Sequence, residues 1–438
     1  MASKRDLTIK KRRLPHAPAP LEAETAPLET MEDEGAPAGE TTVSKKRKWR
    51  PKNKKERRRR RGRSVIWAVL IRLSIITAIL ILGVLVWQNR DRLAPAAVVE
   101  WFDRVFTGGS KGDGYPVDIS GDRVVSVQPF GNQTAVLTDT ALQIYNSTAA
   151  QTAERAHTYA DPLLRVKEEY MVVAELGGTR YTVHNKKEIL REGQVDYAIL
   201  GVAVSANGQV ALATESSQSY RSEVLVFDRK GKEIFHWYSV DLTVIDVAFH
   251  PRQKQIAVLG LSASGGDMCS TLQVFSLGGK ETGAIHTYST TGPMMTSLQF
   301  FENERVGVIG DTAVWVYDPI KNETTTIGFE ESLLLGYAFS PDGIGIVTRD
   351  YGDVGGGVLR HISATGEELG ALPFEGDYRH VAVAENGFYL LTENTLYLAH
   401  KGDVKKQVAV SPDSLMVAEL NGNPLILGLS TLTRVAWE

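Results

Sequence analysis

The sequence predicts an all-β fold over residues 115–438, in the form of a β-propeller with eight four-stranded blades. Three observations lead to this prediction. Short runs rich in valine, isoleucine, tyrosine and phenylalanine alternate apolar with polar residues, as strands with one buried face do. Pairs of these runs flank a turn eight times, at intervals of 36 to 51 residues, which is the length of one blade. No helical periodicity of comparable length follows residue 114.

Each repeat begins with a hairpin whose two apolar strands enclose a polar or glycine-containing turn. The eight turns are centred on Gly131, Glu168, Asn207, Arg252, Asn303, Asp342, Asn386 and Gly422. A third strand follows, for example at residues 142–145, 224–227, 272–275, 314–317 and 395–398. A polar turn and a fourth strand complete the unit, so each repeat has the material for one antiparallel sheet.

The last repeat lacks a fourth strand, because only residues 424–429 and 432–437 can form strands after its turn. Residues 115–119 stand ahead of the first hairpin, where the outer strand of a preceding blade would stand. We expect them to complete the final blade, which pairs the two ends of the domain and protects the sheet edges. A ring of seven blades remains an alternative, because the second and last repeats are the least regular.

Several turns resemble those of known propeller repeats. FSPDG at residues 339–343 and VSANG at 204–208 are similar to the SPDG-type turn of WD40-like and TolB-like propellers. DRKGKE at residues 228–233 resembles a turn of quinoprotein-like eight-bladed propellers. Where that family has a docking tryptophan this chain has Phe235, with Trp237 two residues later, and it contains no adjacent cysteine pair. The resemblance therefore implies the propeller fold without a quinone cofactor.

A single membrane span is predicted at residues 65–87. These 23 residues would form about 35 Å of helix, enough to cross a hydrocarbon core of about 30 Å. Trp67 and Trp87 lie at the two ends, as interfacial tryptophans do, and Arg72 is near enough to the N-terminal end to snorkel. The basic residues that flank the span, and that we expect to fix topology and contact anionic lipid, are Arg57, Arg58, Arg59, Arg60, Arg61 and Arg63.

The charge distribution orients this span. Residues 1–64 hold 20 Lys and Arg against 9 Asp and Glu, whereas residues 88–438 hold 28 against 43. The positive-inside rule therefore predicts a cell-membrane protein with a cytoplasmic N-terminus and an extracytoplasmic C-terminal domain. Cleavage of a signal peptide near residues 94–96 is the alternative, but the 64 residues ahead of the apolar run and Pro95 count against it.

The remaining segments complete the domain organisation. Residues 1–64 are rich in proline and charge and poor in aromatic residues, which predicts a disordered basic cytoplasmic tail. Residues 88–114 form a juxtamembrane amphipathic segment and a glycine-rich linker. The basic cluster at residues 45–63 would suit nucleic acid or a cytoplasmic partner, but its position beside a span favours lipid contact, so no nucleic-acid partner is predicted.

The whole layout is similar to that of uncharacterised membrane-anchored propeller proteins of Gram-positive bacteria, a family of unknown function. The likeness covers nearly all of residues 45–438. Cys269 is the only cysteine, so the chain cannot form an internal disulfide, whereas a eukaryotic extracellular domain of this size usually has several. Both observations favour a bacterial cell envelope.

The sequence predicts no catalytic residue, no metal site and no cofactor. It lacks HExxH, GxSxG, P-loop and paired CxxC motifs, and its histidines are scattered. Three repeats are predicted to carry long loops between their second and third strands, at 215–221, 261–267 and 350–357. Equivalent turns of a propeller lie on one rim, so we expect them to form a partner-binding surface. The candidate residues are Ser219, Tyr220, Arg221, Asp267, Asp350, Tyr351 and Asp353.

A non-enzymatic role is therefore favoured. The leading hypothesis is an extracytoplasmic interaction scaffold that binds a protein or a cell-wall partner. One alternative is a hydrolase or lyase that works at the central channel, which propellers can support. A second is a sensor that couples an external ligand to the basic tail.

Overall fold

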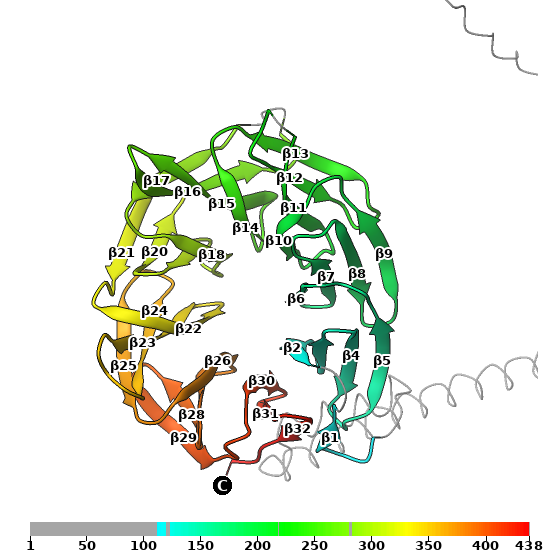
Figure 1. Ribbon diagram of the computed structural model, residues 1–438, viewed down its shortest axis with the longest axis vertical. Coiled ribbons are helices and arrows are strands. Elements are labelled where there is room, and N and C mark those ends of the chain that lie inside the picture. The colour runs from blue at the N-terminus through cyan, green and yellow to red at the C-terminus, as the bar shows by residue number, and fades with distance from the viewer. Residues whose placement is uncertain (1–111, 120–122, 218, 280–282, 438) are drawn as a thin grey trace, which may run out of the picture. The chain divides into compact units, whose positions relative to one another are not determined.

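The computed structural model describes residues 112–119, 123–217, 219–279 and 283–437. These residues contain 32 strands, no helix, and eight four-stranded antiparallel sheets. The sheets stand around a central axis as the blades of a propeller, with one strand of each blade facing the centre (Figure 1). The predicted all-β fold is thus confirmed, and the ring has eight blades rather than seven.

The blades follow one another in chain order. Blade one consists of β2 (Val124–Phe130), β3 (Gln133–Thr138), β4 (Ala141–Asn146) and β5 (Gln151–Ala156), and blade two of β6 (Pro162–Lys167), β7 (Tyr170–Glu175), β8 (Arg180–Asn185) and β9 (Ile189–Gln194). Blade three consists of β10 (Ile199–Val204), β11 (Val210–Glu215), β12 (Ser222–Phe227) and β13 (Glu233–Ser239), and blade four of β14 (Thr243–Phe249), β15 (Gln255–Ser264), β16 (Asp267–Ser276) and β17 (His286–Thr291).

The second half of the ring repeats this pattern. Blade five consists of β18 (Met295–Phe300), β19 (Val306–Gly310), β20 (Ala313–Asp318) and β21 (Glu323–Gly328), and blade six of β22 (Ser332–Ser340), β23 (Gly343–Asp350), β24 (Gly357–Ser363) and β25 (Glu368–Phe374). Blade seven consists of β26 (Tyr378–Ala384), β27 (Gly387–Thr392), β28 (Thr395–His400) and β29 (Asp403–Ala409), and blade eight of β30 (Met416–Leu420), β31 (Asn423–Leu427), β32 (Thr431–Arg434) and β1 (Val117–Asp118).

The two ends of the domain meet in blade eight. Val117 of β1 pairs with Leu432 of β32, and the backbone N–H of Ile119 donates to the carbonyl of Ser430 at 2.6 Å. The predicted closure is confirmed, and β1 and β32 lie side by side in Figure 1. The third strand of this blade is shorter than the sequence suggested, because it ends at Arg434. Because of this closure, the N-terminal strand β1 and the C-terminal strand β32 are hydrogen-bonded to each other.

The hydrophobic core is distributed between the blades. Each cluster of buried residues joins the facing sides of two neighbouring sheets, as where Leu272 of blade four packs with Val308 and Trp315 of blade five. Alternation along the strands produces this arrangement, because successive side chains point to opposite faces of a sheet. Complete burial of one such side chain contributes about 1.5–3 kcal/mol.

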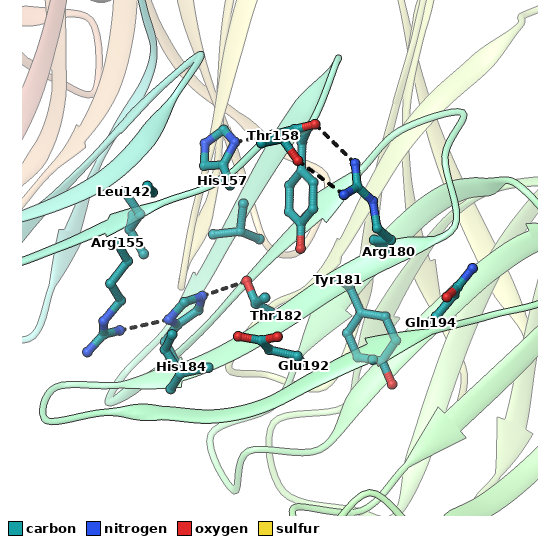
Figure 2. Close-up of a pocket in the computed structure, with 15 residues that line it drawn as sticks. Leu142, Arg155, His157, Thr158, Arg180, Tyr181, Thr182, His184, Glu192 and Gln194 are labelled. Carbon is teal, nitrogen blue, oxygen red and sulfur yellow. Dashed lines mark hydrogen bonds between the residues drawn. The ribbon is translucent and has the colours of Figure 1, made fainter.

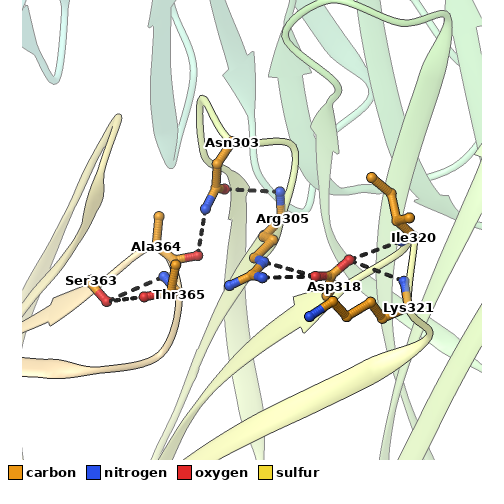
Figure 3. Close-up of polar contacts among 8 residues, drawn as sticks. All are labelled: Asn303, Arg305, Asp318, Ile320, Lys321, Ser363, Ala364 and Thr365. Carbon is orange, nitrogen blue, oxygen red and sulfur yellow. Dashed lines mark hydrogen bonds and ion pairs between the residues drawn. The ribbon is translucent and has the colours of Figure 1, made fainter.

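Polar contacts also link neighbouring blades. They lie on the face of the propeller that carries the turns between first and second strands. Asn303, in the turn between β18 and β19, donates to the carbonyl of Ala364 in blade six at 2.8 Å (Figure 3). Its side-chain oxygen accepts from the N–H of Arg305 at 3.1 Å. The guanidinium of Arg305 in turn forms an ion pair with Asp318, with Nε and Nη2 at 3.0 and 2.9 Å from Oδ2.

Several predictions lie outside the described residues. They are the basic tail at 1–64, the span at 65–87, the juxtamembrane part of 88–114 up to residue 111, and the flanking arginines Arg57, Arg58, Arg59, Arg60, Arg61 and Arg63. In the part of the chain that the structure describes, no helix has the length and hydrophobicity that a membrane crossing requires.

Candidate functional site

One face of the ring carries all the predicted partner-binding residues. In an antiparallel blade, the turn from the second to the third strand and the exit of the fourth strand lie at the same end of the sheet. We use the name insertion rim for one set of residues in blades three to six. It contains the turns from second to third strands, the connections that follow the fourth strands, and two strand residues on each side of every turn or connection. The predicted insertions at 215–221 and 350–357 fall within it, and the one at 261–267 does so from residue 263 onward.

The seven candidate residues are exposed on this rim. Ser219, Tyr220 and Arg221 lie in the turn between β11 and β12. Asp350 ends β23, and Tyr351 and Asp353 lie in the turn that follows it. Asp267 is the first residue of β16.

The insertion at 261–267 is not a loop, contrary to the sequence-based expectation. It extends β15 and β16 into a hairpin with ten residues in each strand, paired as far as Ser264 and Asp267. The turn needs only Gly265 and Gly266, with φ angles of 66° and 98°. Glycine adopts such positive φ values without steric cost, and a two-residue hairpin turn of the primed type requires them.

Large apolar side chains are exposed along the insertion rim. The exposed fractions are 66% for Tyr351, 100% for Val354 and 60% for Val240. The exposed large apolar residues of the rim are Tyr220, Tyr238, Val240, Met268, Met294, Leu333, Tyr351 and Val354. The turns on the opposite face of the same four blades expose Ile234, Ile285 and Ile320 among the described residues. Single exposed apolar residues are ordinary, but a gathering of them on one face marks an interaction surface.

The same rim is acidic. Its exposed acidic residues include Glu215, Asp241, Asp267, Asp311, Glu330, Glu331, Asp350, Asp353, Glu375 and Asp377. Among the described residues of the rim, Arg221 and Arg379 are the exposed basic side chains that oppose them. The surface therefore combines apolar contact area with a negative electrostatic field.

Buried polar groups on the inner strands tie neighbouring blades together. The carboxylate of Asp246 on β14 accepts hydrogen bonds from Ser297 Oγ at 2.7 Å and from the N–H of Leu298 at 3.1 Å, both on β18. His380 on β26 accepts from the N–H of Val417 on β30 at 3.4 Å. Within the described residues, no three His, Cys, Asp or Glu side chains are placed to hold a metal ion. Asp246 and His380 thus link neighbouring blades.

A cavity of about 540 Å³ opens between blades one and two (Figure 2). Arg155 on β5 donates from Nη1 to Nδ1 of His184 on β8 at 2.8 Å, and His184 Nε2 lies 2.7 Å from Thr182 Oγ1. A guanidinium can only donate, so Nδ1 is the acceptor and the proton of the neutral ring is on Nε2. Burial, with the nearby charge of Arg155, lowers the pKa of His184 to about 3, and its side chain is 3% exposed.

The charges around this cavity are unevenly matched. Arg180, at one end, forms an ion pair with Glu175 at 3.1 Å and donates to the carbonyl of Thr158 at 3.0 Å. Among the described residues, Arg155 has no carboxylate within ion-pair distance, and burial lowers its pKa. The carboxylate of Glu192 also lines the cavity, on β9 opposite Thr182 in the sheet register.

The cavity interrupts a repeated packing rule. Six first strands share a β-bulge, which sets a common register for blades one and three to seven. At one register position the fourth strands of blades three to seven carry an apolar residue that faces the next blade. These residues are Trp237, Tyr288, Ile327, Leu372 and Val408. Blade one has Arg155 at this position.

We call the apolar fourth-strand residue at this position the wedge residue. Its contact on the next blade also differs between blades one and two. Trp237 packs against Phe275 of the next blade, with 4.8 Å between ring centroids, and Tyr288 packs against Tyr317 at 6.3 Å. Across blades one and two the corresponding pair is Arg155 and His184. The sequence analysis did not identify either residue. An alignment of the repeats on their turns would have put Arg155 at the repeat position that Trp237 and Tyr288 occupy in other blades.

Comparisons with solved structures agree with this architecture. The chain is similar to Saccharomyces cerevisiae Sqt1 at 10% identity, with 75% of this chain and 100% of that chain covered and a TM-score of 0.51. The Neurospora crassa Pan2 WD40 domain gives 10% identity, coverage of 73% and 93%, and a TM-score of 0.45. Apo AztD from Citrobacter koseri gives 10% identity, coverage of 66% and 86%, and a TM-score of 0.46.

At these identities the likeness shows the propeller fold alone, and that inference rests on Sqt1. No curated protein matches the chain. A family model does match, over residues 113–411, which includes seven of the eight blades. The chain belongs to the family of unknown function DUF5711.

Proposed function

We propose that this protein is a membrane-anchored scaffold whose propeller lies outside the cytoplasm and binds a protein partner through the insertion rim. The observation that carries the proposal is the gathering of exposed apolar side chains on this one face. Tyrosine and methionine are enriched in the cores of protein interfaces, and Tyr220, Met268 and Tyr351 supply such contacts. The anchor rests on the apolar run at 65–87 and the arginines that precede it.

The charge of the rim narrows the class of partner. Asp267, Asp350 and Asp353 lie among the exposed apolar residues, so a partner must bring positive charge to this face. An anionic wall polymer would be repelled by the same field. A protein with a basic surface around apolar anchors is therefore the partner that this rim suits.

Site-specific photo-crosslinking in intact cells tests the proposal. We expect a crosslinker in place of Tyr351 to capture one protein, because its position is on the rim. A crosslinker in place of Ile320 is the matched control, since Ile320 is 84% exposed but lies in the turn between β20 and β21, on the opposite face. The captured protein is identified by mass spectrometry.

The rim substitutions Tyr220→Ser, Met268→Ser and Val354→Ser, combined in one chain, should abolish the crosslink from Tyr351. These side chains are exposed, so we expect the fold to be unaffected. Equal capture from the two faces, or capture that survives the triple substitution, would refute the rim as the binding surface.

A further inference from the structure

We propose that the cavity between blades one and two binds a small organic carboxylate whose other end carries hydrogen-bond donors. The proposal is independent of the insertion rim, because it concerns different blades. It starts from the position of Arg155, where five other blades place an apolar wedge against the next blade. A charged group at a partly buried packing position between two blades is a departure from local design, and such departures are concentrated at functional sites.

Arg155 is held in place as an anion-binding group. His184 is neutral, so it accepts the hydrogen bond from Nη1 without competing for the role of cation. The second contact, from Nη2 to the carbonyl of Asn185 at 3.4 Å, also engages a neutral acceptor. A guanidinium has five N–H donors, so several remain for a ligand. A carboxylate accepts two of them in parallel, which is the geometry that arginine recognises best.

The charge around Arg155 selects a monoanion. Arg180 is already neutralised by Glu175, which leaves Arg155 as the one unpaired cation among the described residues that line the cavity. Glu192 adds a negative charge on the blade-two side of the cavity. A ligand with two or more negative charges, such as phosphate, would be repelled by this carboxylate.

Two further lining residues can accept or donate hydrogen bonds. Glu192 and Gln194 on β9 present a carboxylate and an amide to the cavity (Figure 2). They suit hydroxyl groups or an ammonium group on the ligand. The volume of about 540 Å³ is in the range of small-molecule sites. A sugar acid and an amino acid share this chemistry, a carboxylate at one end and donors at the other.

Isothermal titration calorimetry on the full-length chain in detergent tests the proposal. The probes are sodium glucuronate, which offers hydroxyl donors, and L-alanine, which offers an ammonium donor. Sodium acetate has the carboxylate without donors, and phosphate has the higher charge. We expect saturable binding of glucuronate or of alanine, with an affinity about tenfold or more above that of acetate. Glucuronate binding points to a sugar acid, and alanine binding to an amino acid.

Two variants and a control connect any binding to the cavity. The double variant Arg155→Leu, His184→Phe restores the apolar wedge of the other blades, so we expect it to fold and to lose binding by about tenfold or more. Glu192→Gln changes an exposed side chain and should weaken alanine binding while leaving acetate unchanged. Arg360→Leu in blade six is the control and should bind as the parent does.

Three results would overturn the proposal. The first is the absence of saturable binding of both glucuronate and alanine. The second is tighter binding of phosphate than of either carboxylate, which would leave an adventitious anion site only. The third is binding that persists in the folded double variant or, should that variant not fold, in Glu192→Gln at parental affinity and selectivity. None of these results bears on crosslinking at Tyr351, so the rim and the cavity succeed or fail separately.

Discussion

His184 links the free energy of unfolding to pH. In the folded chain its pKa is lowered to about 3 by burial and by the positive charge of Arg155, with His157 adding to the effect. In the unfolded chain a histidine titrates near pH 6.5. Between these values the unfolded state binds more protons. The free energy of unfolding therefore falls as the pH is lowered from about 6.5 toward 3, by up to about 1.4 kcal/mol per pH unit.

The variant His184→Gln isolates this contribution. Glutamine does not titrate, so we expect the variant to be less stable than the parent at pH 7, with a difference that shrinks as the pH falls to 4. Denaturant unfolding at a series of pH values measures it. The pKa values of His250 and His380 are also lowered by burial, but these residues lie in other blades, are common to both chains and cancel in the difference. A difference that does not vary with pH would show that His184 is not buried in its neutral form.

At the level of single elements, the short strand β1 closes the ring through few residues. Leu432 is fully buried where it pairs with Val117, so Leu432→Ala should lower the free energy of unfolding by about 2–5 kcal/mol. Leu429→Ala is the matched control, because Leu429 is 69% exposed in the preceding turn, and its effect should stay within about 0.5 kcal/mol. Urea unfolding of both variants provides the comparison. Equal losses in the two would mean that closure does not depend on this pair.

The elements that the sequence predicted correctly are those with local signals. All eight hairpin turns lie between first and second strands, because polar or glycine residues there interrupt two alternating apolar runs. The hairpin that turns at Gly265 and Gly266 does not fit the loop predicted there, since the residues before its turn, Ser262, Ala263 and Ser264, lack the usual apolar pattern of a strand. The cavity was missed for another reason: Arg155 and His184 belong to different blades, and their contact depends on how two sheets face each other.

Considered as a whole, the propeller has two unlike faces. The insertion rim is acidic with exposed apolar groups, whereas the turns of the opposite face carry many basic residues, among them Lys187, Arg229, Lys230, Arg252 and Lys321. The ring could be predicted from the repeat length, because each blade buries its two faces only against the neighbouring blades. Which face a partner meets depends on surface residues that the repeat does not constrain. The extracytoplasmic position of the ring is a separate expectation that rests on the sequence alone.

The single cysteine allows that position to be tested. Cys269 is partly buried on β16, with its Sγ 4.0 Å from Thr271 Oγ1, so Cys269→Ser should leave a folded chain without thiols. Into this background we would introduce Ser219→Cys on the insertion rim or Ser44→Cys ahead of the basic cluster. A membrane-impermeant maleimide added to intact cells should label the first and not the second, because the positive-inside rule predicts a cytoplasmic location for residues 1–64. After lysis both should react. Labelling of Ser44→Cys in intact cells, with Ser219→Cys protected, would invert the topology and remove the basis for an extracytoplasmic scaffold.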